Sequence, residues 1–251
     1  MFQFSASFSM LRRSSLSVAP LILIALIAVD PASAAVITGK LGIAAGPGAS
    51  VTVTNSAITF GNNLFSVGGT PPNTGSFAAP FDSPSFQGTI KDLNSSVQIT
   101  GTTFSLLNFL TFTNNAATSF ELTDILPGTN GSAGCTLPAA GGQVCTPILP
   151  AGFGLSPFNL QNNTATQSTA SFVVKGRVIN GVDVTYFTGT FSNTFNSQSF
   201  QDVLAVLGSQ GAVTSTYSAT FDVAPIPEPA SVALVGLTLV GAAGLLRRRR
   251  A

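Results

Sequence analysis

Apolar and polar residues alternate in several short stretches along the middle of the chain. In residues 213–223 (VTSTYSATFDV), the polar residues would share one face of an extended strand and the apolar residues the other, namely Val213, Tyr217, Ala219, Phe221 and Val223. Residues 171–179 repeat the pattern, with Lys175 and Arg177 on the polar face. An alternation with a period of two is typical of a half-buried β-strand. Shorter stretches of the same kind predict further strands at residues 51–54, 97–99 and 106–112.

A turn signal separates the strand at 171–179 from a second β-rich run at residues 182–191. The two residues between them are Asn180 and Gly181. Asn-Gly between two such runs is a strong signal for a type I′ turn. We therefore expect an antiparallel β-hairpin at this point.

One stretch predicts a helix. Ser199 can cap its first turn, and Asp202, three residues further on, completes a capping box. Gly208 would end the helix after about two turns. One face would be apolar, formed by Phe200, Val203, Leu204 and Leu207. We expect this short helix to close one end of a sheet.

Many short strands with turn signals between them predict an all-β body, an antiparallel β-sandwich or barrel-like domain with one short helix. Seventeen of the 20 phenylalanines lie in residues 35–224, where they can fill a core without needing a hydrogen-bond partner. Residues 66–85 are rich in Gly, Pro and Ser, and residues 127–168 have a similar composition. Both ranges predict long loops. The second would be the largest excursion from the sheet.

Both ends of the chain carry features of export. Near the N-terminus, Arg12 and Arg13 precede an apolar run at residues 16–29, and Ala32-Ser33-Ala34 offers the small residues that a signal peptidase reads. We predict a signal peptide over residues 1–34, cleaved between Ala34 and Ala35. A retained anchor is the alternative, but the run is shorter than the roughly 20 residues of a comfortable membrane span. The paired arginines also raise a twin-arginine route, and the serines that follow favour general secretion.

The C-terminal end has three parts in a fixed order. Pro227-Glu228-Pro229 comes first, 17 apolar residues at 230–246 follow, and Arg247, Arg248, Arg249 and Arg250 come last. At about 1.5 Å per residue, a helix over 230–246 would reach roughly 25 Å, enough for a thin membrane. The arginine cluster should stay cytoplasmic. Residues 35–224 would then be an extracytoplasmic β domain, and residues 225–251 a tail with a transmembrane helix held in the inner membrane.

This order of Pro-Glu-Pro, apolar helix and arginine cluster closely resembles the PEP-CTERM sorting signal of Gram-negative bacteria. The resemblance covers about 25 of the 251 residues. It implies that an exosortase, a membrane transpeptidase-like cysteine enzyme, cuts near residues 227–229 and releases or transfers the protein toward the cell surface. It also implies exopolysaccharide of the biofilm matrix as a candidate partner. An ordinary tail anchor is the alternative, and the resemblance says little about what the body does.

The two cysteines lie inside the long loop at 127–168. In an exported chain, two cysteines most often form one disulfide, so we predict a Cys135–Cys145 bond. Closing a loop of about 10 residues would stabilise the fold by on the order of 2–3 kcal/mol. A metal site is the alternative, but the chain has no His, and no acidic residue lies between Asp124 and Asp183.

Charge excludes one class of function. Charged residues are 8% of the chain, against about 25% in an average protein. Residues 35–224 contain four basic and seven acidic residues, a net charge of −3. A nucleic-acid binder needs clustered Lys and Arg, so we expect no nucleic-acid partner.

Few residues are suited to catalysis. The absence of His excludes Ser-His-Asp and Cys-His arrangements. A glycosidase needs two convergent carboxylates, and no apolar pocket is identifiable beside Glu121 or Asp124, so we expect such isolated acids to be solvated edges or caps. Calcium at Asp82 or Asp92 lacks the spacing of a dedicated loop. We expect no enzyme activity, no metal and no cofactor.

Two non-catalytic functions remain. The first is a structural or matrix-associated surface protein. The second is a glycan-binding module, which usually stacks sugar rings on exposed Trp or Tyr. The chain has no Trp, and Tyr186 and Tyr217 are its two tyrosines. Because Tyr217 lies on an apolar strand face, we expect only Tyr186 to be available as a platform.

Overall fold

A computed structural model of the chain describes residues 36–224, except 69–71, 79–80, 82–86 and 151–153. Contacts divide the chain into two units, Met1–Ser33 and Ala34–Ala251, and every described residue belongs to the second. The predicted signal peptide, its cleavage site at Ala34 and Ala35, and the predicted transmembrane helix at 230–246 lie outside the described residues. Within the described ranges, no helix is both long and apolar enough to cross a membrane.

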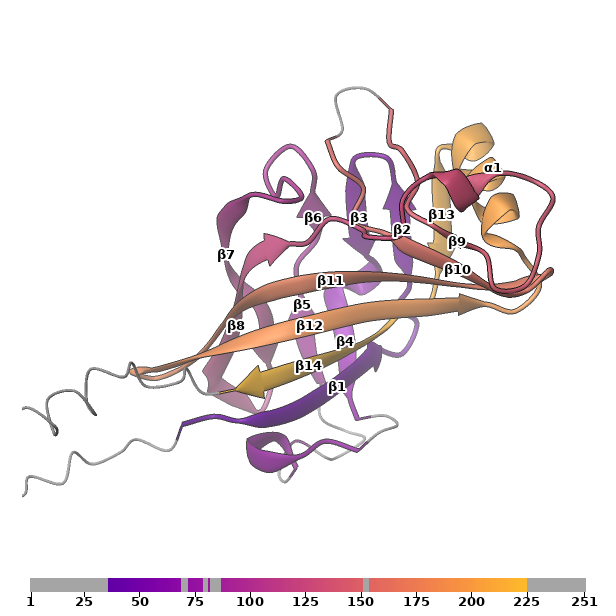
Figure 1. The fold of residues 1–251 in the computed structure, drawn as a ribbon. Helices are drawn as coiled ribbons and strands as arrows, with labels where there is room; N and C mark the ends of the chain where they lie inside the picture. The colour runs from indigo at the N-terminus through magenta and orange to yellow at the C-terminus, as the bar shows by residue number, and fades with distance from the viewer. Residues whose placement is uncertain (1–35, 69–71, 79–80, 82–86, 151–153, 225–251) are drawn as a thin grey trace, which may run out of the picture. The chain divides into compact units, whose positions relative to one another are not determined.

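Eight antiparallel strands form a closed ring (Figure 1). In order around the ring they are β12 (Asp183–Phe195), β14 (Ser218–Ala224), β1 (Gly39–Ala45), β4 (Leu64–Val67), β5 (Gln87–Ile90), β7 (Thr103–Phe112), β8 (Asn115–Ile125) and β11 (Gln167–Asn180). The ring closes because β11 pairs with β8 on one edge and with β12 on the other. The all-β prediction is confirmed, in its barrel form. Closure pairs the strand edges that an open sheet would expose.

Two smaller strand groups extend the barrel. The second half of β11 pairs with β8, and the first half of the same edge pairs with β10 (Asn159–Thr164). β10 pairs in turn with β9 (Val144–Cys145). A separate four-stranded sheet has the order β13 (Ala212–Ser215), β2 (Val51–Thr54), β3 (Ala57–Phe60) and β6 (Leu93–Asn94). The helical elements are η1 (Gly61–Asn63), η2 (Gly75–Phe77), η3 (Ala133–Cys135) and α1 (Phe200–Gln210).

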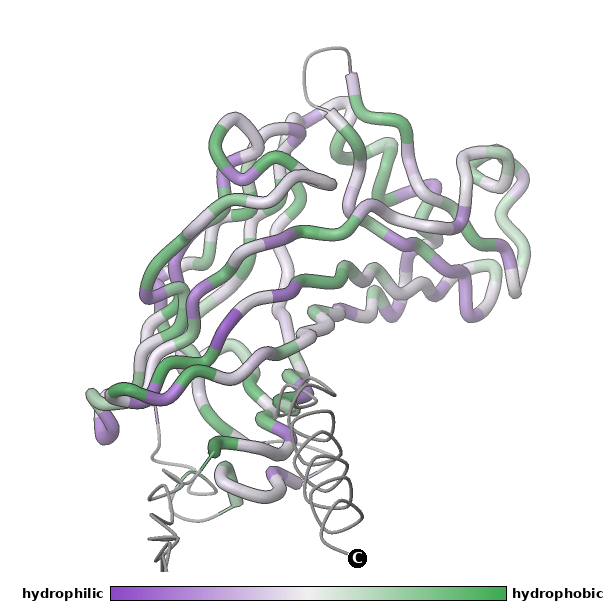
Figure 2. Tube along the Cα trace, turned by 60° about the vertical axis from the view of Figure 1, so that its left-hand side comes forward, coloured by the Kyte–Doolittle hydropathy of each residue, from purple (hydrophilic) through white to green (hydrophobic). Residues whose placement is uncertain are grey.

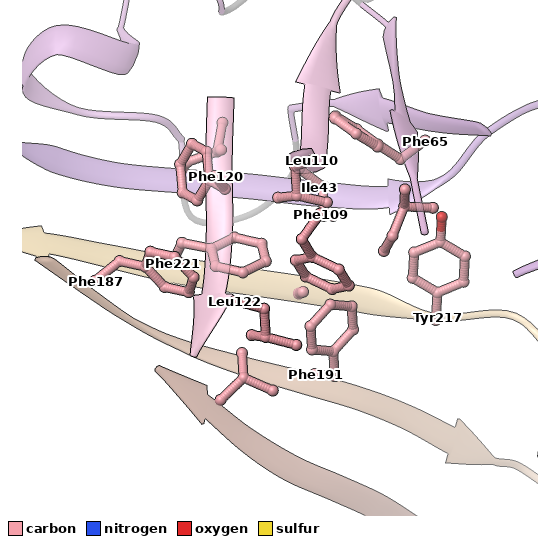
Figure 3. Packing of buried hydrophobic residues seen from close by; sticks show 14 of the residues in the cluster. Ile43, Phe65, Phe109, Leu110, Phe120, Leu122, Phe187, Phe191, Tyr217 and Phe221 are labelled. Atoms are coloured by element: carbon pink, nitrogen blue, oxygen red, sulfur yellow. The ribbon is translucent and has the colours of Figure 1, made fainter. Parts of the chain in front are cut away.

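Phenylalanine rings fill the barrel. Successive side chains of a strand point to opposite faces. The alternation of hydrophobic and hydrophilic residues along the long strands (Figure 2) therefore places apolar side chains inside the barrel. Phe120 packs against Phe187 and Phe221 (Figure 3). The centroid distances are 5.1 and 5.5 Å. Further along, Phe191 stacks on Phe172 at 4.8 Å with 3° between the ring planes. The predicted role of phenylalanine as core material is confirmed for these residues.

Small residues make room for these rings. Gly189 lies on the inward face of β12, where a β-carbon would stand 2.5 Å from the ring of Phe221 and 3.0 Å from a methyl group of Val174. A glycine in a strand interior often marks such a close approach. The aromatic packing of the barrel therefore depends on the missing side chain at this position.

The predicted hairpin is formed, with its turn one residue later than expected. Asn180 pairs with Asp183, so the two loop residues are Gly181 and Val182. Gly181 has a φ of 62°, and Val182 is not among the residues with positive φ. A type I′ turn needs positive φ at both loop residues, whereas type II′ needs it only at the first. The turn matches type II′, because a β-branched valine resists positive φ.

The strand predicted over residues 213–223 is divided between two sheets. β13 joins the four-stranded sheet and β14 joins the barrel, with Thr216 and Tyr217 between them. The ring of Tyr217 packs edge-on against Phe60 at 5.0 Å, and its hydroxyl donates to the carbonyl of Leu64 at 3.1 Å. These contacts hold the chain at the point where it crosses from one sheet to the other.

The prediction of a strand at residues 97–99 is wrong, because the chain forms a turn here. The backbone N–H groups of Val97 and Gln98 both donate to the carbonyl of Asn94, at 3.0 and 2.8 Å, and close a turn. The side chain of Gln98 accepts the N–H of Asn94 at 2.8 Å. Local hydrogen bonds of this kind compete with strand pairing.

The predicted helix is confirmed and is longer than expected. Ser199 and Asp202 form the capping box in α1. The helix continues through Gly208 and ends at Gly211, whose φ of 76° allows its N–H to reach the carbonyl of Leu207 at 2.9 Å. A left-handed glycine is a common helix terminator, whereas an interior glycine only weakens a helix.

Candidate functional site

The predicted disulfide is present and cross-links two parts of the long loop. Cys135 lies in η3 and Cys145 in β9, with their Cα atoms 5.0 Å apart. Cys145 is fully buried and lies opposite Leu160 on β10. Together with Phe200 of α1, these residues form a second small core. The predicted loop excursion is therefore an ordered extension of the barrel over much of its length.

A buried network of side-chain amides ties this extension to α1. Asn162 on β10 is fully buried; its Nδ2 donates to Gln201 Oε1 at 2.8 Å and to Gln143 Oε1 at 3.2 Å. Its Oδ1 accepts the N–H of Phe200 at 2.9 Å. Gln201 Nε2 donates to Gln143 Oε1 at 2.8 Å and to the carbonyl of Thr136 at 3.1 Å. A well-satisfied buried network specifies one arrangement of its elements, here the first turn of α1 against the disulfide loop.

A cavity of about 470 Å³ lies between α1, the four-stranded sheet and the segment Pro147–Pro150. Figure 1 shows α1 beside β13 at this end of the described region. Leu204 and Leu207 of α1 form one wall, Leu160 and Phe158 form another, and Val213 of β13 contributes a third. None of the lining residues carries a charge. The amide network and the disulfide thus hold the walls of an apolar cavity.

An ion pair between a buried glutamate and a half-exposed arginine links β8 and β11 on the outer face of the barrel. The side chain of Glu121 is only 2% exposed, and its Oε2 lies 2.6 Å from Nη2 of Arg177. Ser105 donates a hydroxyl hydrogen bond to the other carboxylate oxygen at 2.7 Å. The expectation that isolated acids are solvated edges or caps is wrong for Glu121, because the strand register places Arg177 directly opposite it.

The partners of Glu121 keep it ionised. Desolvation is the largest single influence and would raise its pKa, but the hydrogen bonds from Arg177 and Ser105 and the charge of Arg177 together lower the pKa below its ordinary value. The same pair raises the pKa of Arg177, chiefly through the hydrogen bond to Glu121. Through these bonds Glu121 connects Ser105 of β7 with Arg177 of β11 across β8.

The other candidate acids also have structural partners. Asp124 accepts hydrogen bonds from the hydroxyls of Thr103 and Thr123 at 3.0 and 2.6 Å. Asp92 accepts the N–H of Phe60 at 2.7 Å, and Asp82 lies outside the described residues. Within the part of the chain that the structure describes, no three His, Cys, Asp or Glu side chains gather as a metal site would require.

Tyr186 stands in register with the ion pair. It lies opposite Arg177 across β12 and β11, and Arg177 lies opposite Glu121 across β11 and β8. Tyr186 is 51% exposed, whereas Tyr217 is 5% exposed. Burial raises the pKa of the Tyr217 hydroxyl. Of the two tyrosines, Tyr186 is therefore the one whose ring is exposed to a ligand, as expected from the sequence.

A second charged row runs beside this one. The paired positions across β8, β11, β12, β14 and β1 are Asp124, Lys175, Thr188, Asp222 and Lys40. Lys40 and Asp222 form an exposed ion pair at 2.8 Å. Six of the eleven charged residues in 35–224 lie on these two rows, so more than half of the charge of the body lies on five neighbouring strands of the barrel.

The predicted sorting residues Pro227, Glu228, Pro229, Arg247, Arg248, Arg249 and Arg250 lie outside the described residues. The family model described as the PEP-CTERM protein-sorting motif matches residues 225–250, the range in which they lie. The predicted sorting signal is therefore confirmed. The curated proteins and the solved structures contain no match to the chain. The motif indicates an exported protein sorted by an exosortase, and it leaves the role of the β body to be argued from its own residues.

Proposed function

We propose that this chain is a non-catalytic structural protein of the cell surface or extracellular matrix of a Gram-negative bacterium. In this proposal, the signal peptide directs export across the inner membrane, and the tail holds the protein there until an exosortase-type enzyme cuts it. The observation that carries the proposal is the sorting motif at residues 225–250. An exopolysaccharide matrix is the proposed destination.

The body has the properties that such a role requires. Disulfides form and persist in the oxidising conditions outside the cytoplasm, and the Cys135–Cys145 bond cross-links the longest loop. The ring of strands pairs the edges at which open sheets would aggregate. The acids Glu121, Asp124 and Asp92 are engaged in bonds that stabilise the fold.

Fractionation tests the proposal. The full chain is produced in a bacterium that contains an exosortase, and surface protein is compared with inner-membrane protein by mass spectrometry of both termini. We expect surface protein to begin at Ala35 and to have lost the arginine cluster. Surface protein that still ends at Ala251 would show that the tail is only an anchor, and surface protein that begins at Met1 would refute the signal peptide.

A second candidate is a glycan-binding module, and the exposed ring of Tyr186 beside Arg177 favours it. Aromatic rings and guanidinium groups together suit the apolar faces and hydroxyls of sugars. Binding of the full chain to a glycan array tests it, with Tyr186→Ala and Tyr186→Phe as a pair. We expect the alanine variant to lose binding and the phenylalanine variant to keep it. Val184→Ala, another exposed position on β12, is the control for a general change of surface.

A further inference from the structure

We propose that the cavity beneath α1 is a binding site for an uncharged ligand that is mostly hydrocarbon and carries one hydrogen-bonding head group. This inference is independent of the structural role proposed above, and it assigns the body a ligand chemistry of its own. It rests on the size of the cavity, the chemistry of its walls and the way these walls are held apart.

The cavity is large enough for an organic ligand. Its volume of about 470 Å³ falls within the roughly 300–1,000 Å³ of typical small-molecule pockets. A water molecule occupies about 30 Å³ of the liquid, so the space is far larger than a packing defect. Leu204 and Leu207 face it from α1, and Leu160 and Phe158 face it from the barrel side.

The walls select against charge. No Lys, Arg, Asp or Glu lines the cavity, and an unpaired charge in apolar surroundings is strongly unfavourable. A fatty acid anion or an ammonium group would find no partner there. A hydrocarbon chain would contact apolar side chains on three sides.

Two lining side chains remain free to recognise a head group. The amide of Asn55 and the hydroxyl of Ser132 line the cavity, and neither side chain forms a hydrogen bond with another described residue. Asn55 is half-buried and lies in the turn after β2, and Ser132 is exposed and directly precedes η3. A hydroxyl, ester or amide on the ligand could take the place of the water that reaches these two side chains at the rim of the cavity.

Collapse of the cavity is opposed by the contacts around it. The Asn162–Gln201–Gln143 network fixes the N-terminal end of α1, and the disulfide places Cys135 in the cavity wall. Ile148 lines the cavity and is 82% exposed, so the site opens to solvent beside an apolar side chain. Such a preformed site lowers the ordering cost of binding.

Photolabelling of the full chain tests the proposal. The probe is dodecanol with a diazirine in its chain, and labelled peptides are identified by mass spectrometry, so that labelling of the cavity is distinguished from labelling of residues 225–251. We expect labels on the peptides that contain Leu204, Leu207 and Ile148. Unlabelled dodecanol in excess should suppress them, and dodecanoate at pH 8 should be at least tenfold less effective.

Two alanine positions provide a matched pair of variants. Ala170 lines the cavity from β11, whereas Ala205 is exposed on α1 and does not line it. We expect Ala170→Phe to lower labelling of α1 at least tenfold and Ala205→Phe to leave it unchanged. Circular dichroism and a non-reducing gel establish that Ala170→Phe is folded and oxidised. If Ala170→Phe does not fold, competition by dodecanol and by dodecanoate in the unmodified chain still tests whether the cavity binds an uncharged ligand.

Three results would overturn the proposal. The first is equal competition by dodecanol and dodecanoate. The second is labelling of α1 that Ala170→Phe, in folded form, leaves unchanged. The third is labelling of the cavity that occurs only after residues 225–251 are removed, because the tail itself would then be the occupant.

Discussion

Arg177 and Glu121 face each other across β11 and β8 with Nη2 and Oε2 2.6 Å apart, and the two side chains differ sharply in exposure: 42% for the arginine and 2% for the glutamate. The carboxylate is therefore desolvated while its partner remains in contact with water. Breaking a pair of this kind lowers the free energy of unfolding less than breaking a fully buried pair does, because solvent can still hydrate the guanidinium when the carboxylate is removed.

Glu121→Gln should lower the free energy of unfolding by about 1–2 kcal/mol at pH 7, since it removes a charge-assisted hydrogen bond on a half-exposed partner. The folded-state pKa of Glu121 lies below its unfolded value. Its contribution is thus present above the unfolded pKa and is lost as the pH falls through the folded one.

Urea unfolding of the body at pH 7 and pH 3 measures this effect. We expect the difference between Glu121→Gln and the unmodified protein to shrink at pH 3. Ser105→Ala, which removes one neutral donor to the same carboxylate, should cost about 1 kcal/mol. A difference that grows toward low pH would contradict the assignment.

Loss of the disulfide should destabilise the body by on the order of 2–3 kcal/mol, the loop-closure entropy of about 10 residues. The double variant Cys135→Ala, Cys145→Ala tests this by urea unfolding. Thiol alkylation without reductant provides the matching check on unmodified protein recovered from outside the cytoplasm. Two free thiols there would mean that the bond does not form in the cell.

Gly189→Ala should cost about 1–3 kcal/mol, the usual penalty of overpacking a core. The new methyl group would meet the ring of Phe221 at 2.5 Å, and neither strand can move without breaking the ladder between β12 and β14. Thr188→Ala, at the neighbouring exposed position of β12, is the control and should change stability by about 0.5 kcal/mol or less. Thermal unfolding of both variants measures the two effects. Equal stability of the two variants would show that the core accepts the added methyl group.

Residues 35–224 should fold without either end of the chain. The closed ring and the second core are formed from residues within this range. Far-UV circular dichroism of the fragment should show little helix, since α1 is the one α-helix among the described residues. A helix content above about a third, the globular average, would contradict the fold.

Glu228→Ala should leave the protein uncut in the inner membrane. The substitution keeps the apolar segment and the arginine cluster, so anchoring should be unaffected while recognition by the enzyme is lost. Replacing Arg247, Arg248, Arg249 and Arg250 with Ser should instead weaken retention, because nothing would then oppose complete translocation. Fractionation with mass spectrometry of the C-terminus distinguishes the two variants. Normal processing of Glu228→Ala would show that the carboxylate is not read.

The features that sequence alone determined are those set by residues close together in the chain. The capping box of Ser199 and Asp202, the hairpin after Asn180 and the Cys135–Cys145 bond within one loop each involve partners separated by ten positions or fewer. The sorting motif at 225–250 is likewise a contiguous pattern. Alternation along 171–179 identified the inward face of β11, because the side-chain period of a strand is fixed by its backbone.

Tertiary structure alone decided everything that depends on which distant segments meet. Pairing of β8 with β11, which closes the barrel, also brings Arg177 to Glu121 and so buries an acid that looks solvated in the sequence. The run at 213–223 is one strand by its pattern, yet packing of Tyr217 on Phe60 divides it. Asn162, in a run of amides typical of a loop, becomes the centre of a buried network only because β10 and α1 meet there. Local patterns fix which face of an element is apolar; the free energy of burial, summed over contacts between remote segments, determines what that face packs against.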